Sequence, residues 1–102
     1  MILLHGTDDT VVGYNGGGLD STFLPTQEGF ANWAQTNGCT DQASTSSFSP
    51  LCESYTQCSA GVEVSLCLVT TDAPNGHVIY TNYENLNIPD VAWDFFKRFP
   101  LP

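Results

Sequence analysis

Two short polar segments of this chain contain the side chains that are best suited to catalysis. One is residues 5–12, which include Asp8 and Asp9, and the other is residues 73–78, which include His77. A carboxylate that accepts a hydrogen bond from an imidazole fixes the tautomer of the ring and stabilises its protonated form. The histidine of such a pair can act as a general base for a nucleophile. If an aspartate of the first segment meets His77, the chain holds two members of a hydrolytic triad.

Each polar segment follows a stretch that reads as a β-strand. Residues 2–5 form a short apolar run, as expected of a parallel strand that is buried on both faces. Residues 62–69 alternate with period two and then become fully apolar, which predicts a second strand. Ligand chemistry in open α/β sheets lies just beyond the carboxyl ends of the strands. Two adjacent strands would therefore bring an aspartate and His77 to the same edge of the sheet.

Two helices are predicted, one between these strands and one at the end of the chain. The first covers about residues 25–37, since Pro25 suits the first turn and Asn37-Gly38 suits the end. The second begins at an Asn87 cap and stops at Pro100. Apolar residues recur at helical spacing in both. We expect the large aromatic residues of these helices to form core contacts: Phe30, Trp33, Trp93, Phe95, Phe96 and Phe99.

The order strand, loop, helix, strand, loop, helix predicts an α/β fold. Two strands cannot form a self-sufficient parallel sheet, because an edge and a face of it would stay exposed. We therefore expect residues 1–102 to be the C-terminal portion of a larger doubly wound sheet. The chain also enters an apolar run directly after Met1, without the basic region and long apolar stretch of a signal peptide. Such a start suggests the interior of a longer domain.

Four cysteines allow three disulfide pairings. A hairpin around Ser59-Ala60-Gly61 would place Cys52 opposite Cys67, where cross-strand Cβ atoms are close enough for a disulfide. This arrangement predicts the pairs Cys52–Cys67 and Cys39–Cys58. Disulfides favour an oxidising compartment, so we expect a secreted protein. The cysteines lack Cys-x-x-Cys spacing, and no metal site is expected.

Charge argues against two classes of partner. The chain has 2 basic and 11 acidic residues, which give a formal net charge of −9. Nucleic-acid binding depends on Lys and Arg that neutralise phosphates, and anionic membrane surfaces attract the same residues. No stretch approaches the roughly 20 apolar residues of a membrane span. We expect neither a nucleic acid nor a membrane as a partner, and a neutral partner stays open.

The candidate residues also have structural interpretations. Asp9 could be a turn former that hydrogen-bonds its own backbone. His5, at a strand end, is expected to be structural. Ser59 lies in Gln57-Cys58-Ser59-Ala60-Gly61, which imitates a Gly-x-Ser-x-Gly nucleophile elbow. It precedes a strand instead of following one, so we interpret Ser59 as a turn residue.

The order of the motifs resembles that of the α/β-hydrolase family. Residues 5–12, with the pattern His-Gly-Thr-x-Asp-x-Val-Val, resemble the acid-bearing loop of that family. Gly76-His77 resembles its histidine loop, and the helix containing residues 92–96 resembles its closing helix. Trp33-Ala34, followed by Asn37-Gly38-Cys39, is more specifically similar to secreted polyhydroxybutyrate depolymerases and feruloyl esterases.

This resemblance implies that Asp9 is the triad acid and His77 the triad base. The family's chain order is nucleophile, acid, histidine, so the serine would lie upstream of Met1. The implied activity is serine carboxylic-ester hydrolysis, without a cofactor, of a plant cell-wall acyl ester or a polyester. The chain would need the missing N-terminal part and would be inactive alone. Another hydrolase chemistry, such as peptide hydrolysis, also stays open.

A different interpretation is a non-catalytic domain. A small, disulfide-stapled secreted domain could bind a neutral glycan or another protein. Aromatic residues such as Trp33, Tyr55 and Tyr80 would then form the contact surface.

Overall fold

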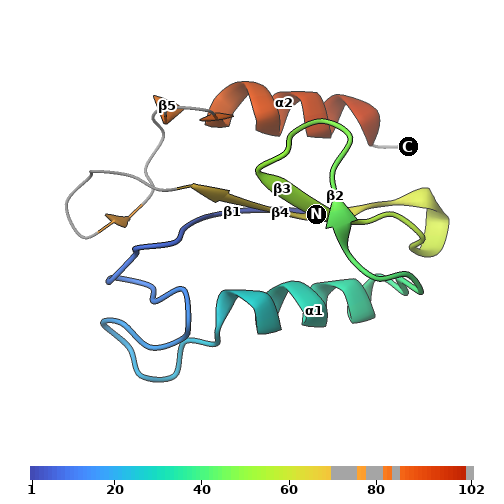
Figure 1. Cartoon of the computed structure of the whole chain (residues 1–102). Helices are drawn as coiled ribbons and strands as arrows, with labels where there is room; N and C mark the ends of the chain where they lie inside the picture. The colour runs from blue at the N-terminus through green and yellow to red at the C-terminus, as the bar shows by residue number, and fades with distance from the viewer. Residues whose placement is uncertain (70–75, 78–81, 84–85, 101–102) are drawn as a thin grey trace.

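The computed structural model describes residues 1–69, 76–77, 82–83 and 86–100 of the chain (Figure 1). Residues 70–75 and 78–81, which include Asn75 and Tyr80, lie outside the described residues. The elements, in chain order, are β1 (Ile2–Gly6), α1 (Thr26–Thr36), β2 (Ser44–Thr45), β3 (Cys52–Tyr55), the 3₁₀ turn η1 (Ser59–Gly61), β4 (Val64–Val69), β5 (Asn82–Tyr83), β6 (Leu86–Asn87) and α2 (Ile88–Arg98). No helix in the described part is long and apolar enough to cross a membrane.

A four-stranded mixed sheet, in the order β1-β4-β3-β2, forms the centre of the structure. β1 and β4 are parallel, with Leu3 opposite Leu66 and Gly6 opposite Val69, as the apolar runs predict. β3 and β2 are antiparallel to their neighbours, because tight connections such as η1 reverse the chain. The sheet is therefore only partly the parallel sheet that the sequence predicts. β5 and β6 form a separate two-stranded sheet.

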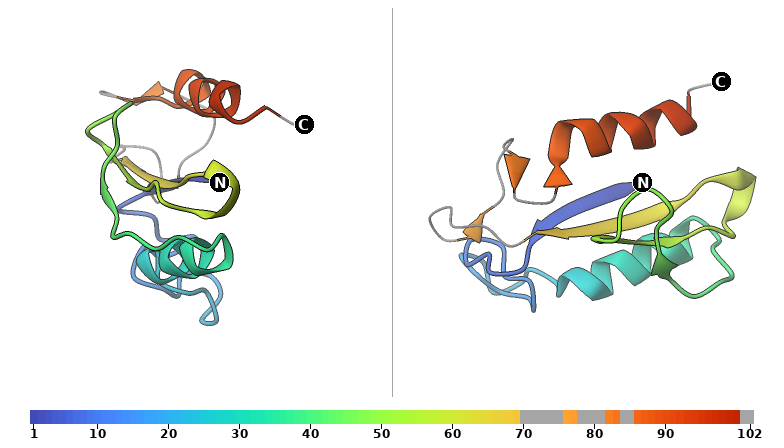
Figure 2. Two further views of the ribbon diagram at one scale, coloured as in Figure 1. Left: turned by 90° about the vertical axis from the view of Figure 1, so that its right-hand side faces the viewer. Right: turned by 45° about the horizontal axis from the view of Figure 1, so that its top comes forward.

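The two helices cover opposite faces of the sheet, as the left view in Figure 2 shows. β4 is buried on both faces and its side chains alternate between two apolar clusters. On the α1 side, Val64 and Leu66 pack with Phe30. On the α2 side, Cys67 and Val69 pack with other buried residues: Cys52, Leu86 and Ile88. The predicted α/β layering is confirmed.

Local signals set the ends of the helices close to where the sequence predicts them. After α1, Gly38 adopts φ +68° and the Cys39 amide donates to the Ala34 carbonyl at 3.0 Å. This is the glycine-dependent stop that Asn37-Gly38 predicts. At the start of α2, the Asn87 side chain accepts a hydrogen bond from the Asp90 amide at 3.1 Å. The predicted asparagine cap is therefore confirmed.

The expectation that the large aromatic residues are buried is correct only in part. Phe30 and Phe95 are 1% and 3% exposed, but Trp33, Trp93 and Phe96 are 44%, 62% and 56% exposed. α1 points Phe30 and Ala34 at the sheet, and Trp33 lies to one side of that stripe, where β1 is the last strand. Helical spacing identifies the apolar side of a helix, but it does not show how far the sheet beneath extends.

Residues 40–50 are rich in serine and threonine, and they contain regular structure. They include β2, and Ser49 is 8% exposed. Phe48 packs against the α2-side cluster and under the Arg98 guanidinium, 5.0 Å from the ring centroid. Arg98 also makes two hydrogen bonds to the Glu63 carboxylate, at 3.1 and 3.2 Å. These contacts attach the end of α2 to the start of β4.

Both predicted disulfides are present. Cys52–Cys67 joins directly paired residues of β3 and β4. Cys39–Cys58 joins the residue after the α1 stop to the turn before η1. The first disulfide fastens β3 to β4, and the second fastens the end of α1 to the segment between β3 and η1.

The two disulfides should differ in their contributions to stability. Their sequence separations of 15 and 19 residues predict nearly equal loop-entropy contributions of about 3 kcal/mol each. Cys52 and Cys67 are 1% and 0% exposed, so replacing both with alanine also removes core contacts. Urea unfolding should show the Cys52→Ala/Cys67→Ala variant to be less stable than Cys39→Ala/Cys58→Ala by about 1–2 kcal/mol. If Cys39→Ala/Cys58→Ala were the less stable variant, the contribution assigned to the buried Cys52 and Cys67 side chains would be wrong.

Candidate functional site

Asp9 and His77, the two residues singled out from the sequence, are in direct contact. The distance from His77 Nδ1 to Asp9 Oδ2 is 2.7 Å. An ionised carboxylate can only accept a hydrogen bond, so Nδ1 is the donor and carries a proton. In the neutral ring, Nε2 is then the unprotonated nitrogen.

The two oxygens of the Asp9 carboxylate have different partners. Oδ1 accepts hydrogen bonds from the backbone amides of Val11 and Val12, at 2.8 and 2.9 Å. Oδ2 accepts the hydrogen bond from His77. Asp9 is therefore a turn former, as the structural interpretation expected, and it also contacts His77. The turn fixes the carboxylate, and the fixed carboxylate orients the imidazole.

The hydrogen bonds favour the charged form of Asp9. Burial raises the pKa of the Asp9 carboxyl, but the Val12 amide, the His77 side chain and the Val11 amide lower it. The net result is a pKa below the ordinary value of 3.8. Asp9 is thus held as an anion beside the imidazole.

The contact between β1 and β4 brings these residues together. The acid loop, residues 7–12, leaves β1 and remains attached to the end of β4, because the Thr7 amide donates to the Val69 carbonyl at 2.9 Å. The two residues of the histidine loop that the structure describes, Gly76 and His77, follow β4 in the chain. Asp9 and His77 therefore lie beyond the carboxyl ends of two parallel neighbours, where α/β sheets place their ligand chemistry.

Exposure differs sharply between the two partners. The Asp9 side chain is 4% exposed, whereas the His77 side chain is 42% exposed. A shielded anion paired with an accessible imidazole is suited to general-base chemistry, because the imidazole can take a proton from a nucleophile and the anion stabilises the resulting cation.

The other candidate residues lie apart from this pair. Ser59 is exposed in η1, at the opposite end of the sheet from the acid loop (Figure 1). His5 Nδ1 donates to the Gly6 carbonyl at 2.8 Å, and the ring lies edge-on to Tyr14. Among the described residues, no group of three or more His, Cys, Asp or Glu could hold a metal ion.

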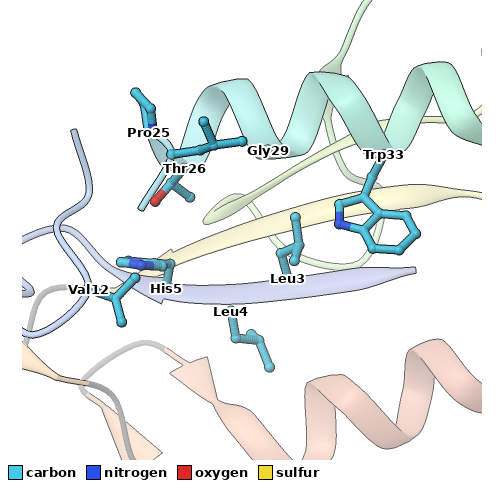
Figure 3. Close-up of a pocket in the computed structure, with 9 residues that line it drawn as sticks. Leu3, Leu4, His5, Val12, Pro25, Thr26, Gly29 and Trp33 are labelled. Carbon is cyan, nitrogen blue, oxygen red and sulfur yellow. The ribbon is translucent and has the colours of Figure 1, made fainter. Parts of the chain in front are cut away.

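An apolar pocket of about 190 Å³ opens beside β1, under α1 (Figure 3). No described strand pairs with this outer side of β1. Val12 links the pocket to the site, since its amide binds Asp9 and its side chain contributes to the lining. The residues that line the pocket are Leu3, Leu4, His5, Val12, Leu24, Pro25, Thr26, Gly29 and Trp33.

The sequence does not single out Val11 and Val12 as partners of Asp9. Their contribution is a backbone amide, which any residue except proline supplies. The residue type at position 9 does indicate such a contact, since aspartate commonly hydrogen-bonds the backbone amide two residues further on.

The fold and this site define a mixed α/β domain with a hydrogen-bonded Asp–His pair beyond its parallel strands. No protein-family model matches the chain, and no solved structure matches it. The chain is 36% identical, over 108 aligned residues, to feruloyl esterase B of Piromyces equi. The similarity covers 100% of this chain and 18% of feruloyl esterase B. The chain is therefore a distant homologue of one region of an esterase.

The pKa of Asp9 leads to a prediction about stability in acid. A carboxyl whose pKa is lower in the folded than in the unfolded state stabilises the fold above its unfolded pKa, and that contribution is lost as the pH falls through its folded pKa. For Asp9 this loss occurs below about pH 3.8. Asp9→Asn should lower stability at neutral pH and flatten the acid-induced fall, as measured by urea unfolding between pH 2 and 7.

Asp8→Asn is the matched control, because it removes one charge from the same loop and Asp8 is exposed. An equal flattening in both variants would show that general charge, and not the contact with His77, is responsible.

Proposed function

We propose that this chain supplies the acid and the base of a serine carboxylic-ester hydrolase. The observation that carries the proposal is the 2.7 Å contact between His77 Nδ1 and the shielded Asp9 carboxylate, beyond the ends of two parallel strands. The similarity to a region of feruloyl esterase B supports the same chemistry. In this proposal the chain forms the C-terminal part of an α/β-hydrolase sheet.

The mechanism assigns one role to each residue. His77 Nε2 takes the proton of a serine hydroxyl as its oxygen attacks the ester carbonyl, and Asp9 stabilises the imidazolium that forms. The imidazolium then protonates the departing alcohol, which leaves an acyl-enzyme. A water molecule, deprotonated by the same imidazole, attacks the acyl group and releases the acid and the serine.

The nucleophile and the oxyanion donors belong, in this proposal, to a part of the enzyme outside these residues. Ser59 cannot serve, because it lies at the other end of the sheet. The outer side of β1, with which no described strand pairs, and the pocket beneath Trp33 offer a surface against which another part of the enzyme can pack. No cofactor takes part in this chemistry.

The proposed substrate is a plant cell-wall acyl ester such as a feruloyl ester, with a polyester as the alternative. The name of feruloyl esterase B favours the first. The two disulfides are typical of an oxidising compartment, which supports secretion. An extracellular polymer ester is therefore the proposed target.

A chimera can test this proposal. Feruloyl esterase B whose matching region is replaced by this chain should hydrolyse a feruloyl ester. Asp9→Asn in the chimera should lower kcat by about 10⁴, as expected when the triad acid is lost. His77→Ala should lower kcat further, by about 10⁶. Asp8→Asn is the control and should retain activity. A folded, active chimera that tolerates His77→Ala would overturn the proposal.

The isolated chain provides a second control for the same experiment. It should not hydrolyse p-nitrophenyl acetate above the uncatalysed rate. Turnover that disappears in a Ser59→Ala variant would mean that the nucleophile lies within the chain after all.

A second candidate function is favoured by the exposed aromatic rings. Trp33, at 44% exposure beside an apolar pocket, is suited to stack on a neutral sugar ring. As a non-catalytic glycan-binding domain, the chain would bind xylan fragments with a change in tryptophan fluorescence that Trp33→Ala abolishes and Trp93→Ala preserves. The hydrolase proposal expects no such binding by the isolated chain.

A further inference from the structure

Gly76 lies directly before His77 and is buried against the acid loop. Its φ is +64°, a conformation that residues with a side chain rarely adopt. At this residue the backbone of the histidine loop also lies close to the backbone of the acid loop.

The space next to Gly76 is occupied by backbone atoms. A Cβ atom at position 76 would lie 2.9 Å from the Asp9 amide nitrogen and closer still to the carbonyl group of Asp8. Ordinary van der Waals contact starts at 3.4 Å. A backbone neighbour, unlike the end of a flexible side chain, cannot move aside by changing rotamer.

The acid loop is held in place from several directions. The Thr7 amide donates to Val69, the Val11 carbonyl accepts from the Leu19 amide at 2.9 Å, and Asp9 Oδ1 binds two amides of its own loop. A side chain at position 76 would therefore displace residues 76 and 77 and leave the acid loop in place. The hydrogen bond between His77 and Asp9 would be stretched beyond its 2.7 Å and lost.

We propose that Gly76 is the positioning residue of the Asp9–His77 pair: the absence of a side chain at position 76 lets the two loops meet closely enough for the imidazole to donate to Asp9. Gly76 acts through His77 and needs no contact with a substrate. Its importance for catalysis rests on the proposed function, but its effect on the geometry of the pair does not.

The test compares Gly76→Ala with Gly61→Ala. Gly61 has nearly the same conformation, φ +70°, but no atom lies within 4 Å of an added Cβ. The two variants therefore introduce similar backbone strain, and only Gly76→Ala introduces a steric clash. A difference in behaviour between the two variants is therefore due to the close approach of the two loops at Gly76.

The readout is the tautomer of His77 in the 102-residue chain, measured by ¹⁵N–¹H correlation NMR at a pH where the imidazole is neutral. Contact with Asp9 favours a proton on Nδ1, whereas a free histidine favours Nε2. We expect the wild type and Gly61→Ala to hold the Nδ1–H form, and Gly76→Ala and Asp9→Asn to lose it. Retention of the Nδ1–H form in Gly76→Ala would overturn the proposal.

A double-mutant cycle keeps the test decisive if the variant is less stable. His77→Ala should lower the urea midpoint of the wild type and of Gly61→Ala, and it should have no effect in Gly76→Ala, where the contact is already lost. If Gly76→Ala fails to fold while His77→Ala folds, Gly76 serves the fold and not the pair, and the proposal is wrong. An inactive chimera whose His77 keeps the Nδ1–H form would contradict the proposed function and leave this inference intact.

Discussion

The parallel pairing of β1 and β4 is the contact on which the rest of the structure depends. It joins segments that are 62 residues apart, as the bond from Thr7 to Val69 illustrates. Because the strands run in the same direction, the loops that follow them leave the same edge of the sheet, and Asp9 can reach His77. The helices on the two faces, and the disulfide from β3, hold β4 in the position that this pairing requires. The proximity of Asp9 and His77 thus depends first on the direction of the two strands and only then on their side chains.

Asp9 shows that one carboxylate can stabilise its own turn and also accept a hydrogen bond from a distant imidazole. Its Oδ1 completes a turn and its Oδ2 meets His77, so the side chain is immobilised by the same loop that it stabilises. Burial alone would disfavour the charged carboxyl, but the hydrogen bonds outweigh it and the pKa falls. An aspartate that satisfies both demands contributes an oriented negative charge, which a surface carboxylate with free rotation cannot provide.

The sequence predicts the features that local patterns determine. Apolar runs, an asparagine cap and a glycine stop locate β1, β4 and the two helices, and hairpin geometry pairs the cysteines correctly. β2 was missed because two residues are too few to show alternation. Trp33 was misplaced because its exposure depends on where the sheet ends. Asp9 and His77 could be proposed from their positions after strands, but the close approach at Gly76 depends on the packing of two distant loops.

The outer side of β1 has a further consequence for the physical behaviour of the chain. No described strand pairs with this side of β1, and such an apolar edge is a template for strand addition from another molecule. The exposed ring of Trp33 nearby increases the tendency to adhere. The net charge of −9 opposes such encounters at neutral pH through mutual repulsion. Near the isoelectric point, about pH 4.1, this repulsion vanishes. In the 102-residue chain the negative charge therefore opposes self-association along a strand edge that no described strand pairs with.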